Sequence, residues 1–302
     1  MVIMALPKEF IERLTEQFGA SNTAVILRGM AAKRPTTFRT NLLKATDDEV
    51  MAGLRESQVM FARIKEIPHA FSVRGIENEA VLKLKLNLDG KIYLQGLTSM
   101  LPAMILEPKP GETILDLCAA PGSKTSQMAA LMGNKGKILA CEENSVRYQK
   151  LMNTISIQGA STVEAKLEDA TVLHHTMAGS FDKILADVPC SAEGRINVDD
   201  QRSYGFWSVK NIVAHAKLQR RLLRSAYLCL KPGGTLVYST CTLAGEENEE
   251  MMDWFLEEYP DMKAVEVAVP FAPAVKHKNK SLTLLPSAQA EGFFVAKLVK
   301  KV

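Results

Sequence analysis

Residues 113–125 read TILDLCAAPGSKT, and this stretch decides the fold that the sequence predicts. A short apolar run at 113–117 leads into a turn of small residues, and a helical stretch follows at 124–132. Small residues let the backbone approach a ligand closely, and the free N–H groups at a helix start favour a carboxylate or a phosphate. Lysine does not follow Gly122 directly, and the sequence contains no G-x-G-x-x-G. A nucleoside triphosphate and NAD are therefore not the expected ligands.

The same rhythm of short apolar runs and helical stretches continues to the C-terminus. We predict strands at 113–117, 137–141, 162–166, 183–187, 235–239 and 293–298, and helices at 124–132, 146–158 and 212–230. This alternation predicts an α/β fold, a doubly wound parallel sheet with helices on both faces. Ligands of such a sheet bind beyond the carboxyl ends of its strands.

Composition and length limit the class of protein. The 302 residues are 47% hydrophobic and 24% charged, which is typical of a folded soluble protein of one or two domains. The sequence has no long apolar stretch and no leader-like start, so we expect a cytoplasmic protein without a membrane segment. Five cysteines without a C-x-x-C pair exclude a disulfide scaffold and a zinc finger, and the histidines form no ligand set, so we expect no metal.

An N-terminal unit precedes this alternation. We predict helices at 8–31 and 47–56 and short apolar segments at 62–67, 81–88 and 92–94, which form a small α/β domain of residues 1–92 before a second domain of residues 93–302. Residues 1–92 hold 14 Lys and Arg against 11 Asp and Glu, which is the whole net charge of +3. Phosphate binding is one interpretation and a solvated basic face is the other for a cluster in this domain, namely Arg28, Lys33, Arg34, Arg39 and Lys44.

Acidic residues follow the second and third predicted strands of the larger domain. Glu142 comes at the end of one strand, where a carboxylate accepts hydrogen bonds from ribose hydroxyls, and Asp169 follows the next, where a carboxylate suits an adenine amino group. Together with the small-residue turn they describe a site for an adenosine with an amino-acid tail, which fits S-adenosylmethionine. The turn residues that we assign to this cofactor are Cys118, Ala119, Ala120, Pro121, Gly122, Ser123 and Lys124.

Two thiols follow the fourth and fifth predicted strands. The strand at 183–187 leads to Cys190, and the strand at 235–239 leads to Cys241. If these strands are neighbours, about 4.8 Å apart, both thiols lie on one wall of the cleft. The other three cysteines are expected to pack in the core.

Several motifs resemble those of one family. DLCAAPGSKT at 116–125, DVPCSAEGR at 187–195 and YSTCT at 238–242 closely resemble motifs of the RNA 5-methylcytosine methyltransferases of the NOL1/NOP2/Sun (RsmB/NOP) family. The resemblance extends from about residue 34 to the C-terminus, although Ala192 stands where glycine is common. It implies a Rossmann-like class I methyltransferase sheet, an RNA-binding N-terminal domain, and ribosomal or transfer RNA as partner. No obligate protein partner is evident.

The resemblance also implies roles for single residues. Cys241 is the nucleophile that adds to carbon 6 of cytosine and makes carbon 5 reactive, and Cys190 assists release of the product. We expect Asp187 to supply a proton or hydrogen bond to N3 of the base and to contribute to the cofactor site, and Lys124 to orient Asp187 or the base. The family pattern suggests Arg147 as a contact on the cofactor side.

The target cytosine must be unpaired or turned out of its stack, since a duplex hides the face of the ring. A segment that either stacks on nucleotides or packs beneath a loop contains Arg195, Tyr204, Phe206 and Trp207. The acidic run at 246–250 is explained as the start of a helix. Two rival interpretations are a non-catalytic RNA-binding relative and a methyltransferase that acts on DNA or protein.

Overall fold

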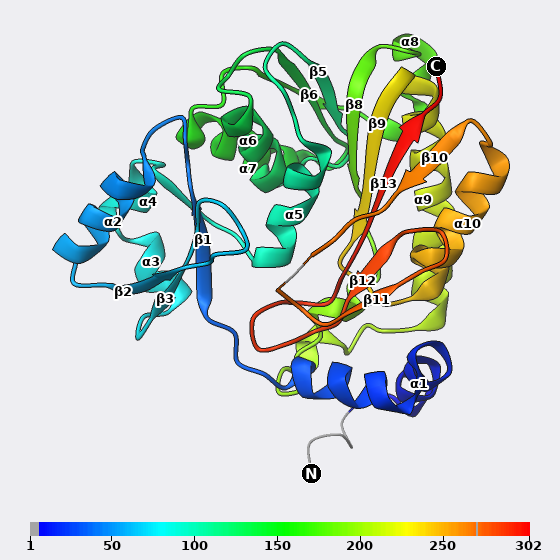
Figure 1. The fold of residues 1–302 in the computed structure, drawn as a ribbon, viewed down its shortest axis with the longest axis horizontal. Helices are drawn as coiled ribbons and strands as arrows, with labels where there is room; N and C mark the ends of the chain where they lie inside the picture. Colours follow the sequence, from blue (N-terminus) through cyan, green and yellow to red (C-terminus); the bar gives the residue numbers. More distant parts are fainter. Residues whose placement is uncertain (1–5, 270) are drawn as a thin grey trace.

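A computed structural model describes residues 6–269 and 271–302, so the first five residues of the predicted N-terminal domain lie outside the described part. The chain forms two sheets that lie side by side (Figure 1). The smaller one comes from the N-terminal third of the chain, and the larger one carries the predicted alternation.

The smaller sheet is antiparallel. Its strands, in the order β2-β3-β1-β4, are β1 (Thr36–Thr40), β2 (Met60–Arg63), β3 (Ala70–Arg74) and β4 (Ile92–Leu94). The accompanying helices are α2 (Asp47–Glu56), α3 (Asn78–Leu82) and α4 (Lys85–Leu88). This β-α-β-β-α-β sequence is that of a ferredoxin-like unit. Helix α2 confirms the helix predicted at 47–56, and it begins with a capping box in which Thr46 and Glu49 bond reciprocally.

Two points that the sequence left open in this domain are settled by the structure. The apolar segment at 81–88 is mostly helical, since α3 and α4 cover most of it, and β1 runs through the basic segment for which phosphate binding was one interpretation. The side chains of Phe38, Phe71 and Ile92 pack in the core beneath this sheet, so β1 is a central strand with most of its residues buried. Phe38 is the one apolar residue of β1 and Arg39 follows it, so the sequence shows no apolar alternation that would mark the strand.

The larger sheet confirms all six predicted strands. Its order is β11-β12-β13-β9-β8-β5-β6-β7, and β10 pairs with β13. The six predicted strands are β5 (Thr113–Asp116), β6 (Lys137–Glu142), β7 (Val163–Leu167), β8 (Phe181–Asp187), β9 (Leu230–Thr240) and β13 (Phe293–Lys300). The others are β10 (Met262–Val265), β11 (Ala274–Lys276) and β12 (Leu282–Leu284).

The sheet is not parallel throughout, as the sequence had predicted. Strands β5 to β9 run parallel, but β13 is antiparallel to β9 and pairs with β12 across the short connection 285–292. A parallel partner needs a crossover of a dozen or more residues, which this connection does not provide. The parallel part carries the strand ends on which the predicted site depends.

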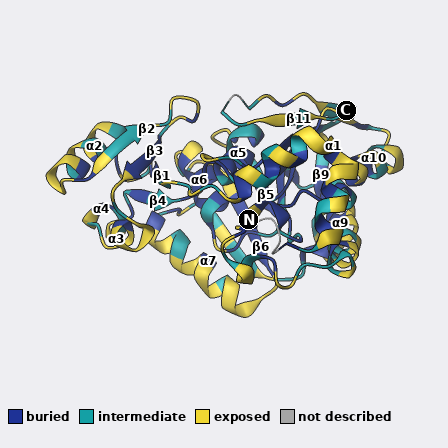
Figure 2. Cartoon of the chain, turned by 90° about the horizontal axis from the view of Figure 1, so that it is seen from below, coloured by how far each residue is buried: buried dark blue, intermediate teal, exposed yellow. Residues whose placement is uncertain are grey.

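Helices cover both faces of the larger sheet, so the strands are buried between layers whose outer sides are exposed (Figure 2). The helices are α5 (Leu97–Leu106), α6 (Ser123–Leu131), α7 (Ser145–Gln158), α8 (His174–Met177), α9 (Val209–Cys229) and α10 (Glu249–Glu258). Helices α9 and α10 pack on one face, and α5 and α6 on the other. Helices α6, α7 and α9 confirm the three that were predicted for this domain.

Helix α1 (Lys8–Met30) confirms the helical prediction for 8–31 and has a kink at Gly19. It lies beneath the C-terminal part of the chain rather than on the smaller sheet (Figure 1), because Phe10 and Ile26 share a core cluster with Leu243 and Leu285. The division that we predicted between residues 92 and 93 falls within β4. It stays a prediction, but the packing assigns all of β4 to the smaller sheet and α1 to the larger unit.

Candidate active site

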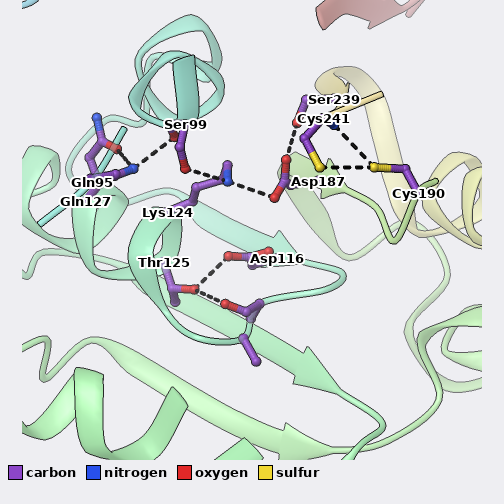
Figure 3. A network of polar contacts seen from close by, with 12 residues as sticks. Gln95, Ser99, Asp116, Lys124, Thr125, Gln127, Asp187, Cys190, Ser239 and Cys241 are labelled. Carbon is purple, nitrogen blue, oxygen red and sulfur yellow. Dashed lines mark hydrogen bonds and ion pairs between the residues drawn. The ribbon is translucent and has the colours of Figure 1, made fainter. Parts of the chain in front are cut away.

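The two cysteine loops lie side by side. Strands β8 and β9 are parallel neighbours whose register sets Asp187 opposite Ser239, so the loops that follow them leave the sheet together. The Sγ atom of Cys190 lies 3.2 Å from that of Cys241, and the backbone N–H of Cys241 donates to Cys190 Sγ over 3.3 Å (Figure 3). The geometric expectation that both thiols share one wall is confirmed.

The pKa values of the two thiols are shifted in opposite directions by their surroundings. A hydrogen bond from Cys190 lowers the pKa of Cys241, and the nearby positive charge of Arg195 acts in the same direction. The hydrogen bond to Cys241, together with burial, raises the pKa of Cys190 well above its ordinary value. The thiolate, which is the nucleophilic form of cysteine, therefore forms at Cys241 while Cys190 keeps its proton.

An ion pair stands beside the thiols. Lys124 Nζ lies 2.8 Å from Asp187 Oδ2, and the hydroxyl of Ser239 donates to Asp187 Oδ1 over 2.7 Å (Figure 3). On its other side Lys124 donates to Ser99 Oγ over 3.0 Å, and Gln95 Nε2 donates to the carbonyl of Ser99. The structure thus brings Lys124 and Asp187 together, and a chain of hydrogen bonds fixes the lysine from the side of α5.

The small-residue turn after β5 is shaped by its contacts. Gly122 has φ of +99°, and a Cβ there would come within 3.0 Å of Thr154. Arg147 donates to the carbonyl of Ala120 over 2.7 Å and lies 3.4 Å from the carboxylate of Glu142. Only glycine adopts the Gly122 conformation without strain. The turn is therefore held from below by α7, whose Arg147 joins the turn to the end of β6.

A hollow opens beyond the carboxyl ends of β5, β6 and β7. Four predicted cofactor residues line it, namely Cys118, Glu142, Arg147 and Asp169. Glu143 and Glu168, the acidic neighbours of Glu142 and Asp169 in the sequence, also line it. Residues that the sequence did not indicate complete the lining, and these are Leu117, Ala170, Thr171, Pro189, Leu218 and Leu222. Two carboxylates and an apolar wall from α9 suit hydroxyl and amino groups on a flat ring, so this donor set fits S-adenosylmethionine.

The remaining predicted cofactor residues do not line this hollow. Ala119, Ala120, Pro121, Gly122 and Ser123 form the turn at its side, while Lys124 and Asp187 face the thiols. Asp116, at the end of β5, accepts a hydrogen bond from Thr125 over 2.7 Å, and burial raises the pKa of this carboxyl to about 7. Burial also raises the pKa of the Cys118 thiol, so Cys118 is a packing residue rather than a second nucleophile.

Glu247 is a site residue that the sequence analysis misinterpreted. The acidic run was expected to begin a helix, and α10 does begin within it at Glu249, but the Glu247 side chain turns inward and is fully buried. It accepts hydrogen bonds from the backbone N–H of Ser191 over 3.2 Å and from Gln219 over 2.7 Å, and burial raises its pKa to about 7. Glu247 thus fixes the loop that carries Cys190.

The aromatic segment after β8 is mostly structural. Tyr204 is buried, and Trp207 packs edge-on against Phe10 of α1 with a centroid distance of 5.4 Å and donates to Glu193 over 2.7 Å. Of the three aromatic rings of this segment, only that of Phe206 is exposed. Arg195 stays beside the thiols, where Glu291 pairs with it at 3.6 Å.

Much of the N-terminal basic cluster is also used inside the molecule. Arg39 is buried and donates to Gln95 and Ser126, and burial lowers its pKa to about 10. Arg34 donates to two backbone carbonyls, and so does Lys44. Arg28 and Lys33 keep exposed side chains. Of these five residues, Arg39 is too buried to belong to an exposed phosphate-binding surface, and for the other four phosphate binding stays a prediction.

Among residues 6–269 and 271–302, no three His, Cys, Asp or Glu side chains gather into a group that would hold a metal ion. Within those same ranges no helix is both long and apolar enough to span a bilayer.

The fold and the site together define a Rossmann-like methyltransferase with a ferredoxin-like N-terminal domain. A model of the 16S rRNA methyltransferase family RsmB/F matches residues 103–299, and a model of the ferredoxin-like domain of RsmF/B-like methyltransferases matches residues 6–76. The chain belongs to the RsmB/F family, whose cofactor is S-adenosylmethionine.

Similar proteins of known sequence or structure support this family assignment. Ribosomal RNA small subunit methyltransferase F of Cronobacter sakazakii is 35% identical over 98% of this chain, and the chain spans 64% of that relative's length. A methyltransferase homologue from Pyrococcus horikoshii is 31% identical with a TM-score of 0.86, over 99% of this chain and 97% of the other. NSun6 from Pyrococcus horikoshii, solved with the S-adenosylmethionine analogue SFG, is 26% identical with a TM-score of 0.88 over 98% of each chain.

Proposed function

We propose that this chain methylates carbon 5 of an unpaired or flipped-out cytosine in small-subunit ribosomal RNA. The observation that carries the proposal is the pair of thiols 3.2 Å apart, one with a lowered and one with a raised pKa, beside the Lys124–Asp187 ion pair. The names of the family and of the Cronobacter relative support ribosomal RNA as the substrate class. When bound, S-adenosylmethionine supplies an electrophilic methyl group.

Cys241 is the nucleophile in this proposal. Its thiolate forms a bond to carbon 6, and the electron pair of the double bond moves towards carbon 5 and N3, so carbon 5 becomes nucleophilic. Arg195 and the S–H of Cys190 both stabilise the thiolate before it attacks. The assignment of the nucleophile to Cys241 rather than Cys190 comes from the family resemblance, and the lowered pKa of Cys241 agrees with it.

Asp187 and Lys124 act on the ring of the base. As carbon 6 is attacked, negative charge develops at N3, and a proton donor placed there lowers the barrier. Lys124 Nζ lies 2.8 Å from Asp187 Oδ2. The ammonium group is therefore able to pass a proton to the Asp187 carboxylate, and the carboxyl group is then able to give N3 that proton or a hydrogen bond. Hydrogen bonds with Ser99 and Ser239 hold the side chains of Lys124 and Asp187 in position.

Cys190 serves the last step. After methyl transfer the proton on carbon 5 passes to water, and the electron pair of that C–H bond re-forms the C5–C6 double bond. The electron pair of the S–C6 bond returns to Cys241 Sγ, and a proton taken up at N3 returns to the carboxylate of Asp187. The S–H of Cys190 then donates a hydrogen bond to the departing sulfur, since the two atoms are already in contact. Without that donor the adduct is expected to persist.

The test is a comparison of Cys241→Ser, Cys190→Ala and wild-type enzyme on a 16S rRNA transcript with S-adenosylmethionine. We expect Cys241→Ser to lose product by about 10⁴-fold or more and to form no adduct. Cys190→Ala, which removes the donor, should form a covalent protein–RNA complex that survives denaturing electrophoresis. Cys229→Ala, a buried cysteine at the end of α9, is the matched control and should behave like wild type.

The same assay decides between the rivals. Methylated nucleosides are identified by mass spectrometry after digestion, so the position of the methyl group on cytosine is read directly. Transfer RNA, DNA and protein substrates are assayed in parallel, and stronger labelling of any of these overturns ribosomal RNA as the substrate. Absence of methyl transfer to every substrate would favour a non-catalytic RNA-binding protein.

A further inference from the structure

Helix α9 is basic along its whole outer face. Its 21 residues include five Lys and Arg and no Asp or Glu. All five side chains are exposed, and we call them the α9 basic face: Lys210, Lys217, Arg220, Arg221 and Arg224. Four of these residues recur at helical spacing on one side, over roughly 21 Å at 1.5 Å per residue, and Arg220 lies next to that stripe.

These charges are largely uncompensated. Within the described residues, only Arg221 of the five has a carboxylate within ion-pair distance, at 3.8 Å from Asp169. Outside α9, the other groups around the face are His174 and His175 of α8 on one flank and Glu258 of α10 on the other. Residues 93–302 contain 37 − 14 = 23 Lys and Arg and 34 − 11 = 23 Asp and Glu, so this domain is neutral as a whole. The charge on α9 is therefore a local concentration.

Aromatic side chains border the same face. The Arg220 guanidinium lies over the Trp254 ring, 4.8 Å from its centroid. Arg220, Arg224, Trp254 and Tyr259 line a hollow of about 450 Å³ between α9 and α10. Arginines next to an aromatic ring suit a phosphate backbone with an unstacked base, because the guanidinium binds phosphate and the ring offers a stacking surface.

The α9 basic face also borders the site. On the inner side of the same helix, Leu218 and Leu222 line the cofactor hollow, and Arg221 donates to Thr171 at its rim. Helix α9 follows the loop of Cys190 along the chain and lies between α8 and α10 with its outer side exposed (Figure 2). An RNA that enters the cleft has this face beside it.

We propose that the α9 basic face is a docking surface for the phosphate backbone of the substrate RNA, outside the catalytic cleft. The inference rests on the proposed function, because it takes RNA as the substrate. The sequence analysis had looked for phosphate-binding charge in the N-terminal cluster. Three residues of that cluster, Arg34, Arg39 and Lys44, bond within the protein, whereas the side chains of the α9 basic face are all exposed.

The test uses the triple variant Lys217→Gln, Arg220→Gln and Arg224→Gln, which leaves Arg221 and the cofactor rim intact. The probe is a 16S rRNA transcript titrated at several salt concentrations. Each lost phosphate contact should reduce the slope of log K against log salt by about 0.7 to 0.9, so we expect a decrease of about 2 to 3 and a roughly 100-fold weaker Kd at 0.1 M salt. S-adenosylmethionine binding, measured by calorimetry, should not change.

Two control variants make the result specific. Lys217→Arg, Arg220→Lys and Arg224→Lys keeps the charge and should retain the wild-type slope. Lys263→Gln, Lys278→Gln and Lys280→Gln removes the same charge from other exposed sites and should also retain it. A single Arg224→Gln variant, with an expected slope change of about 0.7 to 0.9, serves if the triple variant melts at a lower temperature.

A wild-type slope in the α9 triple variant overturns the proposal, and so does an equal loss in the variant of Lys263, Lys278 and Lys280. If only the affinity for poly-L-glutamate falls, the face binds an acidic protein and the proposal is likewise overturned. Methyl transfer by the wild-type chain is measured separately, so a failure of the proposed function is seen as missing product and not as an unchanged salt slope.

Discussion

Cys190 and Cys241 are the same side chain at equivalent places, each in the loop after one of two neighbouring parallel strands, yet their chemistry is opposite. The pKa of Cys241 is lowered because Cys190 donates to it and Arg195 lies nearby, whereas burial and the same hydrogen bond raise the pKa of Cys190. The loops also differ in support, since Glu247 fixes the Cys190 loop from within. Residue type alone therefore does not make a nucleophile here, and its neighbours do.

Apart from the loss of Cys241 itself, the largest effect should come from the ion pair that faces both thiols. Asp187→Asn removes the negative charge next to Lys124 and breaks the 2.8 Å contact. We expect kcat to fall by about 10²-fold to 10⁴-fold, since a positioned proton donor contributes that much. Single-turnover methylation of the rRNA transcript measures it. Asp182→Asn, at the opposite end of the same strand, is the control, and an equal loss there would show that the effect is structural.

A second change tests the asymmetry itself. Cys190→Ala removes the hydrogen bond that is the largest cause of the lowered pKa of Cys241, so that pKa should rise. Alkylation of Cys241 by iodoacetamide should then have its midpoint at higher pH. Its rate at pH 7 should fall, because less thiolate is present, but only by roughly threefold, because the more basic thiolate is also more nucleophilic. Peptide mass spectrometry follows the reaction. An unchanged pH profile would mean that Arg195 alone sets the acidity of Cys241.

The support of the Cys190 loop predicts a pH dependence of stability. Burial raises the pKa of Glu247 to about 7. A carboxyl with a higher pKa in the folded than in the unfolded protein, where it is about 4.3, binds its proton more tightly when folded. Its contribution to the free energy of unfolding is thus fully present at low pH and is lost as pH rises towards 7, by about 1 to 3 kcal/mol.

Glu247→Gln has no proton to lose in this range, so its stability should vary less between pH 4.5 and pH 7.5 than that of the wild type. Chemical denaturation across this pH range measures the difference. Two other carboxyls, Asp116 and Glu193, also have their pKa raised to about 7 by burial and leave part of the slope in the variant. Identical slopes in both proteins would contradict the inward role of Glu247.

The smallest effect concerns the backbone between the two cysteines. Ala192 has φ of +61°, in the left-handed region where alanine is strained. Ala192→Gly relieves that strain but increases the entropy of the unfolded chain, so we expect a gain of only about 0.5 kcal/mol in the free energy of unfolding. Thermal unfolding measures it. A loss of stability would show that the alanine methyl group contributes packing that outweighs the strain.

The sequence predicted the larger sheet better than the smaller one. Each of the six predicted strands of the larger sheet is a short apolar run bounded by turns, so the run itself marks the strand. In contrast, β1 holds a single apolar residue, Phe38, beside Arg39, so no apolar run marks this central strand. The antiparallel direction of β13 was missed for a related reason, because the composition of a strand does not state its direction.

The candidate site divides in the same way. Motif residues such as Cys190, Cys241 and Asp187 were found because they follow recognisable strands. Glu247 was assigned to a helix start because charges in a run usually face solvent, and nothing in the run indicates that one carboxylate turns inward. The basic residues of α9 were overlooked because charge was counted by domain rather than by face.

Spacing along the chain was enough to predict six strands of the larger sheet, the small-residue turn and the two thiols at strand ends. The folded structure was needed to show which thiol has the lower pKa, which carboxylate is buried and which cations are exposed. Those properties depend on neighbours such as Cys190 and Cys241, which lie 51 positions apart in sequence but in contact in space. The pKa of a thiol and the exposure of a cation depend on distances and burial in the folded protein, and spacing along the chain does not specify these.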